Sequence, residues 1–144
     1  MKLPGDYVAG FIDGEGCFCI TIGKHRTAKN RLDPRLVFEI ELRDDDRNIL
    51  DDICDTLGCG RIYHLIYERY GWNPHVKLKV SSLKDITERL IPFFNKYPLR
   101  AKKKRSFEIF CQAVEIFKQK KHLTETGIKQ LYDLRKGMNV YSSK

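Results

Sequence analysis

Residues 8–16 combine a helix-forming apolar stretch with small residues and an acidic residue. Gly10 and Gly14 are four residues apart, so in a helix they stack on one face and leave it nearly bare of side chain. A bare face lets another backbone approach closely. Glu15 follows between two glycines, and a carboxylate at the end of such a close contact is well placed to hold a divalent metal ion.

A second candidate for chemistry is the basic run from Arg100 to Arg105. Most of such a run is expected to be a solvated helix start that contacts phosphates without sequence preference. The five cysteines contain no C-x-x-C pair, and the four histidines do not stand at zinc-ligand spacing from them. We therefore interpret the cysteines as reduced thiols of an intracellular protein that pack as small apolar residues.

The elements that must position these residues follow from periodicity. A short helix is expected from an N-cap at Asp6 to about Gly14. Alternation of apolar and polar residues predicts four strands, and apolar stripes at helical spacing predict the remaining helices. The strands are expected at about 17–23, 35–42, 61–67 and 75–80, and the helices at about 44–57, 82–94 and 102–121, with a short final helix from residue 124. Ser82 and Asp85 form a capping box at the start of the second of these helices. The order α-β-β-α-β-β-α-α-α predicts an α+β fold with antiparallel hairpins.

Each predicted strand has one apolar face and one face of polar, basic or small residues. Any single strand of this kind is more simply read as part of an ordinary solvated sheet. Four together, with a net charge of +8 and a pI near 9.3, favour a polyanionic partner. An antiparallel ribbon fits the major groove of DNA and reads base edges with every second side chain. The expected DNA-binding residues are Cys17, Cys19, Thr21, Lys24, Arg26, Lys29, Arg31, Arg35, Val37, Glu39, Glu41, Arg61, Tyr63, Tyr67, Lys77 and Lys79.

Length and composition bound the remaining possibilities. A chain of 144 residues is expected to form one domain over residues 1–144. No segment is apolar enough to span or anchor in a membrane, and the N-terminus lacks the apolar core of a signal peptide. These features predict an intracellular protein, in a bacterial or archaeal cytoplasm or an organelle matrix.

The stretch Val8-Ala9-Gly10-Phe11-Ile12-Asp13-Gly14-Glu15-Gly16 resembles the signature of the LAGLIDADG homing endonucleases. The resemblance extends in order through Leu57-Gly58-Cys59-Gly60-Arg61-Ile62-Tyr63 and Tyr97-Pro98-Leu99. It implies the family's α-β-β-α-β-β-α fold with a four-stranded antiparallel DNA-binding saddle, here followed by an extra C-terminal helix.

The resemblance also implies a site. Because the signature occurs once, two copies are expected to pair through their signature helices, with Val8, Gly10, Phe11, Asp13 and Gly14 at the interface. Glu15 and the Gly14 carbonyl would hold Mg²⁺ or Mn²⁺, whereas Ca²⁺ could occupy the site without supporting cleavage. Asp13 is expected to accept hydrogen bonds from backbone amides across the interface rather than to act in catalysis.

Family members place one lysine of the basic run near the active site, which here corresponds to Lys102 or Lys103. A polar residue that positions water in some dimeric relatives is replaced by Leu42, with Arg43 or Asp44 as candidate substitutes. The small side chains of Cys17, Cys19 and Thr21 predict few direct contacts at the centre of the target and more reliance on DNA bending.

The sequence thus predicts a homodimeric, Mg²⁺-dependent endonuclease encoded by an intron. It would cut both strands of a long, pseudo-palindromic DNA target and leave short 3′ overhangs. The alternative is a member that binds DNA or RNA without cleavage and acts as an intron maturase or regulator, which makes intron RNA a further candidate partner. An acidic residue at position 15 favours cleavage, since a protein that only binds gains nothing from a carboxylate facing phosphate.

Overall fold

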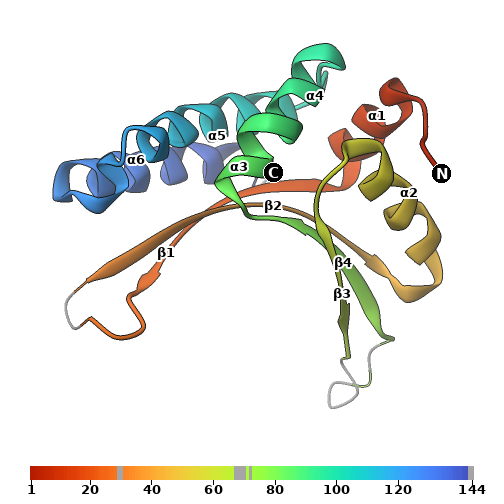
Figure 1. Ribbon diagram of the computed structural model, residues 1–144, viewed down its shortest axis with the longest axis horizontal. Coiled ribbons are helices and arrows are strands. Elements are labelled where there is room, and N and C mark those ends of the chain that lie inside the picture. The colour runs from red at the N-terminus through yellow and green to blue at the C-terminus, as the bar shows by residue number, and fades with distance from the viewer. Residues whose placement is uncertain (29–30, 67–70, 72, 143–144) are drawn as a thin grey trace.

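The computed structural model describes residues 1–28, 31–66, 71 and 73–142, with side chains described through residue 138. Helices cover one side of an arched, four-stranded antiparallel sheet and leave the concave side uncovered (Figure 1). The elements are α1 (Gly5–Glu15), β1 (Gly16–Lys24), β2 (Leu32–Arg43), a 3-10 turn (Asp44–Asp46), α2 (Arg47–Leu57), β3 (Arg61–Leu65), β4 (His75–Val80), α3 (Leu83–Asp85), a π-helical turn (Ile86–Leu90), α4 (Ile91–Lys96), α5 (Lys103–Lys118), a second 3-10 turn (Lys121–Leu123) and α6 (Glu125–Ser142). This arrangement confirms the predicted α+β fold.

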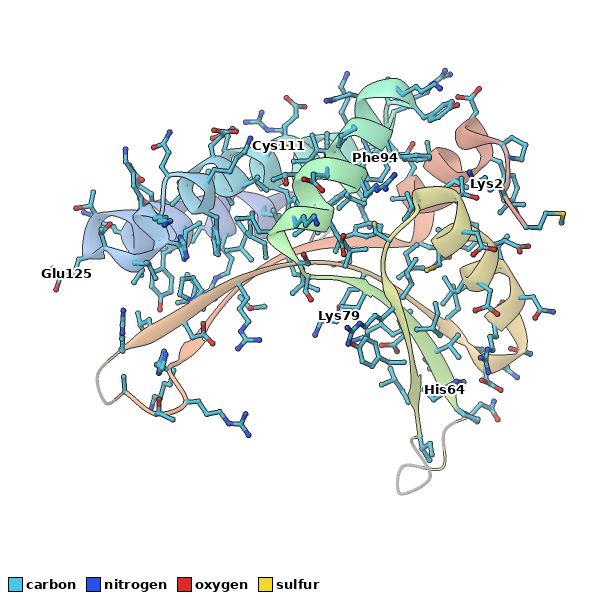
Figure 2. The ribbon with its side chains drawn as sticks, in the orientation of Figure 1. Lys2, His64, Lys79, Phe94, Cys111 and Glu125 are labelled. Carbon is cyan, nitrogen blue, oxygen red and sulfur yellow. The ribbon has the colours of Figure 1, made fainter. Side chains whose placement is uncertain are left out.

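The order of the strands across the sheet is β1-β2-β4-β3, and every neighbouring pair is antiparallel. Cys17 stands opposite Glu39, Glu39 opposite Lys79, and Lys79 opposite Arg61. Directly opposed residues share a face, so this row crosses all four strands on one side of the sheet. Figure 2 shows Lys79 on the concave side and Phe94 on the side covered by helices. The strand faces predicted from alternation are therefore confirmed.

A cluster of phenylalanines forms the centre of the core between the sheet and the helices. The Phe18 ring from β1 lies 5.0 Å from that of Phe38 in β2 and 5.2 Å from that of Phe110 in α5, measured between centroids. Phe94 of α4 packs 5.1 Å from Phe107 of α5. Tilted and edge-on arrangements of this kind add about 0.5–1.5 kcal/mol per pair to the gain from burial. The convex face of the sheet is therefore the face that holds the fold together.

Several predicted boundaries differ from the structure. Asp6 lies in the first turn of α1 rather than at its N-cap, which is Pro4 without a side-chain hydrogen bond. Ser82 does cap α3, because its hydroxyl accepts a hydrogen bond from the Asp85 amide. The final helix was expected to be short, but α6 has 18 residues. It packs along α5, so tertiary contact extends it beyond what its own sequence pattern indicated.

Two further observations concern the helices that cover the sheet. Gly58 ends α2 with a left-handed backbone (φ 74°), as its position after the apolar stripe predicted. In the part of the chain that the structure describes, no helix has the length and apolar character needed to cross a membrane.

Candidate nucleic-acid interface and carboxylate site

Glu15 stands where the first helix meets the sheet. α1 ends at Glu15 and β1 begins at Gly16, with no connecting residue. A Cβ atom on Gly16 would lie 2.9 Å from the carbonyl oxygen of Ile12 and 2.6 Å from its Cγ2. Only glycine therefore allows the strand to start this close to the helix. The Glu15 side chain is exposed at this junction.

The predicted bare face of α1 is present. A Cβ atom placed on Gly10 or Gly14 would meet nothing within 4 Å, and both residues are exposed. Tyr7 lies one turn earlier on the same face and is 52% exposed. Val8, in contrast, is 0% exposed and belongs to the core of its own chain, so the expectation that it lies at an interface is wrong. Phe11 is half-buried, 6.5 Å from the Tyr7 ring between centroids.

Asp13 binds backbone amides of its own chain. Its carboxylate accepts hydrogen bonds from the Arg100 amide at 2.9 Å and the Ala101 amide at 3.1 Å. The expected bonding to amides is thus present, but those amides lie just before α5 rather than in a partner chain. This contact ties the end of α1 to the basic run.

The two candidate lysines occupy different surroundings. The Lys103 side chain is half-buried, and its ammonium group donates a hydrogen bond to the carbonyl oxygen of Gly16. This places a positive charge at the junction that carries Glu15. Lys102 is exposed at the N-cap of α5.

Two thiols follow Glu15 on the concave side of β1. Their sulfur atoms, Cys17 Sγ and Cys19 Sγ, lie 3.3 Å apart. A hydrogen bond from the Cys19 thiol, assisted by the charge of Lys103, lowers the pKa of Cys17 to about 6. The same contact raises the pKa of Cys19.

A charged network occupies the middle of the concave face. The Lys77 ammonium group lies 3.4 Å from a carboxylate oxygen of Glu39 and 3.7 Å from one of Glu41. His75 Nδ1 lies 2.9 Å from the other oxygen of Glu41. Alternation in the sequence predicts Lys77 and both glutamates on this face, but it does not reveal the ion pairs between them. Opposite charges at alternate positions of β2 and β4 were the available signal, and strand register was the missing information.

The other expected DNA-binding residues divide by exposure. Val37 shares the concave face but is only 7% exposed, so little of its side chain could touch DNA. Lys29 and Tyr67 lie outside the described residues. The members that lie exposed in the structure are Cys17, Thr21, Lys24, Arg26, Arg31, Arg35, Glu41, Arg61 and Tyr63. Cys19, Glu39, Lys77 and Lys79 are half-buried.

The residues near the end of β2 include the two candidates to replace the polar residue that positions water in some relatives. Leu42 is half-buried against the core. Arg43 pairs with Asp45 at 3.4 Å, and Asp44 lies 3.8 Å from His64 Nδ1. Both candidate substitutes are therefore already engaged in contacts within the chain.

The junction offers hard oxygen ligands but not a complete metal site. Glu15 supplies an exposed carboxylate, and Gly14 lies in the last turn of α1, where carbonyl groups lack partners within the helix. Such oxygens suit Mg²⁺, which usually takes one or two carboxylates and completes its shell with phosphate and water. Among the described residues, no group of three or more His, Cys, Asp or Glu side chains gathers at one point. The residues fit a metal shared with a nucleic acid rather than one enclosed by this chain.

Comparison with known proteins assigns this chain to a family of endonucleases. The sequence profile of the LAGLIDADG endonucleases matches residues 8–114. The chain belongs to the LAGLIDADG endonuclease family. Among curated relatives, "Probable intron-encoded endonuclease 3" of Neurospora crassa is 32% identical over 132 residues, which are 92% of this chain and 24% of that protein. An uncharacterized protein encoded in ND4 intron 1 of Podospora anserina is 31% identical over 121 residues, covering 83% of this chain and 25% of that protein.

Solved structures share the fold. The I-LtrWI LAGLIDADG homing endonuclease, bound to its target DNA, superposes with a TM-score of 0.86 at 33% identity, over 96% of this chain and 45% of that chain. The homing endonuclease I-TnaI superposes with a TM-score of 0.85 at 27% identity, over 96% of this chain and 90% of that one. This chain thus spans about a quarter of the Neurospora relative and under half of I-LtrWI, but nearly all of I-TnaI.

Proposed function

We propose that this chain is one subunit, formed by residues 1–144, of a site-specific endonuclease that cuts double-stranded DNA. The observation that carries the proposal is the exposed Glu15 carboxylate at the α1–β1 junction, beside the concave face of a sheet in a strongly basic protein. A carboxylate in that position opposes phosphate binding unless a divalent cation lies between them. The family relationship supports the same activity, since relatives are named as intron-encoded endonucleases.

The concave face is the proposed binding surface for the DNA duplex. Exposed Thr21, Arg35, Arg61 and Tyr63 line it, and the half-buried Lys79 stands in the same row as Arg61. Arginine and lysine at alternate positions can contact both phosphates and guanine edges. I-LtrWI, with the same fold, was solved bound to its target DNA.

Cutting both strands requires a second copy of the carboxylate. The bare face of α1 around Gly10 and Gly14 is the surface through which two copies of this domain would pair. A two-fold axis between the paired helices would place one Glu15 on each side and favour a pseudo-palindromic target. By family likeness, the products carry short 3′ overhangs.

Glu15 and the Gly14 carbonyl are the groups that would hold Mg²⁺ or Mn²⁺. A bound divalent ion supplies polarisation of the scissile phosphate and stabilisation of the leaving oxygen. Lys103 contributes a fixed positive charge at the junction, and its hydrogen bond to Gly16 keeps that charge in place before DNA arrives. Asp13 orients the end of α1 through its bonds to the amides before α5. A protein with this activity would act in the compartment that holds its DNA target.

A cleavage selection tests the proposal. Purified protein with Mg²⁺ is offered randomised duplex DNA, in parallel with Glu15→Gln and with Glu125→Gln, an exposed glutamate on α6 far from the junction (Figure 2). We expect double-strand breaks at one near-palindromic sequence, with cleavage reduced about a hundredfold to a thousandfold in Glu15→Gln because the metal ligand is removed. The Glu125→Gln variant should cut normally.

Metal dependence is tested on the recovered sequence. Chelation should stop cleavage, and Mg²⁺ or Mn²⁺ should restore it. Ca²⁺ should support binding without breaks; the structure of I-SmaMI with uncleaved target and calcium ions is in line with that expectation. Cleavage by Glu15→Gln at the rate of the unchanged protein would overturn the assignment. Salt-sensitive recovery of one sequence without breaks under any metal would overturn the nuclease activity itself.

A further inference from the structure

The two thiols that follow Glu15 form a pair that the proposed cleavage does not use. Cys17 and Cys19 are two residues apart in β1, so both side chains project from the concave face. Their sulfur atoms lie 3.3 Å apart, and Cys17 is exposed while Cys19 is half-buried. An exposed thiol in contact with a second thiol is the arrangement of a site where oxidation is resolved within the chain.

The other cysteines are arranged differently. Cys54 points its thiol at the carbonyl oxygens of Cys59 and Gly60, at 3.3 and 3.6 Å, rather than at a second sulfur. Burial raises the pKa of both Cys59 and Cys111 to about 11, which disfavours their reactive thiolate forms. Among the described residues, the close contact between thiols is confined to β1.

We propose that Cys17 and Cys19 are a reversible oxidation site, at which hydrogen peroxide closes a disulfide within β1 and a dithiol reopens it. The Cys17 sulfur attacks one peroxide oxygen and loses its thiol proton, and the O–O bond breaks. The released hydroxide takes up that proton to become water, and Cys17 is left as a sulfenic acid. The Cys19 sulfur then attacks the Cys17 sulfur, and the oxygen leaves as water. Overall, two thiols lose two electrons and two protons, and one peroxide becomes two waters.

Closure changes the geometry of the strand that begins beside Glu15. A disulfide bond is about 2.05 Å long, so the two sulfur atoms must approach by roughly 1.2 Å from their separation of 3.3 Å. Bridging residues this near in one strand strains the bond and makes it easy to reduce. A displacement of about 1 Å in an active site can lower the rate about a hundredfold. Resting on the proposed function, this predicts that the oxidised protein loses DNA cleavage.

Tryptic mapping tests the chemistry without reference to function. Cleavage at lysine and arginine places Cys17 and Cys19 alone in fragment 3–24, Cys54 and Cys59 in 48–61, and Cys111 in 106–118. After brief treatment with peroxide, we expect fragment 3–24 to lose two hydrogens, resist alkylation, and recover both thiols with dithiothreitol. Fragment 48–61, which also holds two cysteines, is the internal control and should remain fully alkylated.

Cysteine-to-serine variants show which thiols form the disulfide. Cys17→Ser and Cys19→Ser should each abolish the bridge, whereas Cys54→Ser should keep it. Free thiols, sulfinic acid alone, or a bridge to a second chain in fragment 3–24 would overturn the proposal. A bridge that forms without changing cleavage would overturn only its effect on catalysis. If neither the reduced nor the oxidised protein cuts any DNA, the proposed function fails, and the fragment masses still decide whether the bridge exists.

Discussion

The two faces of the sheet are built from alternate residues of the same strands but are held together by different forces. In β4, Leu78 is fully buried on the convex face, while its neighbour Lys77 lies among carboxylates on the concave face. Packed apolar groups gain about 25 cal/mol for each Å² of surface buried, whereas charges beside water gain little from pairing. We infer that packing on the convex face determines the stability of the domain. Residues on the concave face can then differ according to the DNA that they bind.

The largest effect is expected on the convex side. Leu78→Ala removes a fully buried side chain from the centre of β4 and leaves a cavity that the core cannot fill. We expect the free energy of unfolding to fall by about 2–5 kcal/mol. Urea denaturation followed by circular dichroism measures the loss. A loss as small as that of a surface substitution would show that the convex face does not carry the stability.

A smaller effect is expected where α1 joins the sheet. Gly16→Ala forces a Cβ atom against the Ile12 backbone, and overpacking of this kind costs about 1–3 kcal/mol. Gly23→Ala, in the same strand, is the matched control, since its new methyl group meets open space and alanine in a strand is more stable than glycine by about 0.5–1 kcal/mol. The melting temperatures of the two variants should therefore shift in opposite directions from that of the unchanged protein. A Gly16→Ala variant as stable as the unchanged protein would mean that neighbouring groups relieve the crowding at Gly16 at little cost.

The smallest change in stability is expected on the concave side. Lys77→Ala breaks two ion pairs that are partly exposed, so the free energy of unfolding should change by less than about 1 kcal/mol. DNA affinity should nevertheless fall, because Glu39 and Glu41 would face phosphate without the intervening cation. Titration of labelled target DNA at several salt concentrations measures both the affinity and its salt dependence. Full affinity with large destabilisation would reverse the comparison between the two faces.

The same contrast explains what could be predicted from the sequence. Alternation with period two identified Phe18, Phe38 and Leu78 as core residues, since burial depends on which face a residue occupies. The partners of Lys77 depend on register, which alternation alone does not specify. Val37 shows the same limit from the other side, because alternation places it on the concave face although its side chain is only 7% exposed.

The sequence predicted the residues of the candidate site better than it predicted their contacts. The glycines of α1 and the exposed carboxylate of Glu15 stand as the signature indicated. The burial of Val8 and the bonding of Asp13 to amides before α5 were not foreseen. Both depend on which elements pack around α1, and contacts between residues more than eighty positions apart leave no local mark in the sequence. The catalytic and metal-binding roles of Glu15 and Lys103 remain predictions.

The absence of any residue between α1 and β1 has a consequence for target choice. With Glu15 ending the helix and Gly16 opening the strand, neither element can slide relative to the other. In a paired nuclease, the distance between the two half-sites would then be set by the protein and could not stretch to suit the DNA. One base pair inserted at the centre of the target displaces a half-site by about 3.4 Å along the duplex. Such an enzyme would tolerate base substitutions in its recognition sequence far better than the insertion or deletion of a base pair.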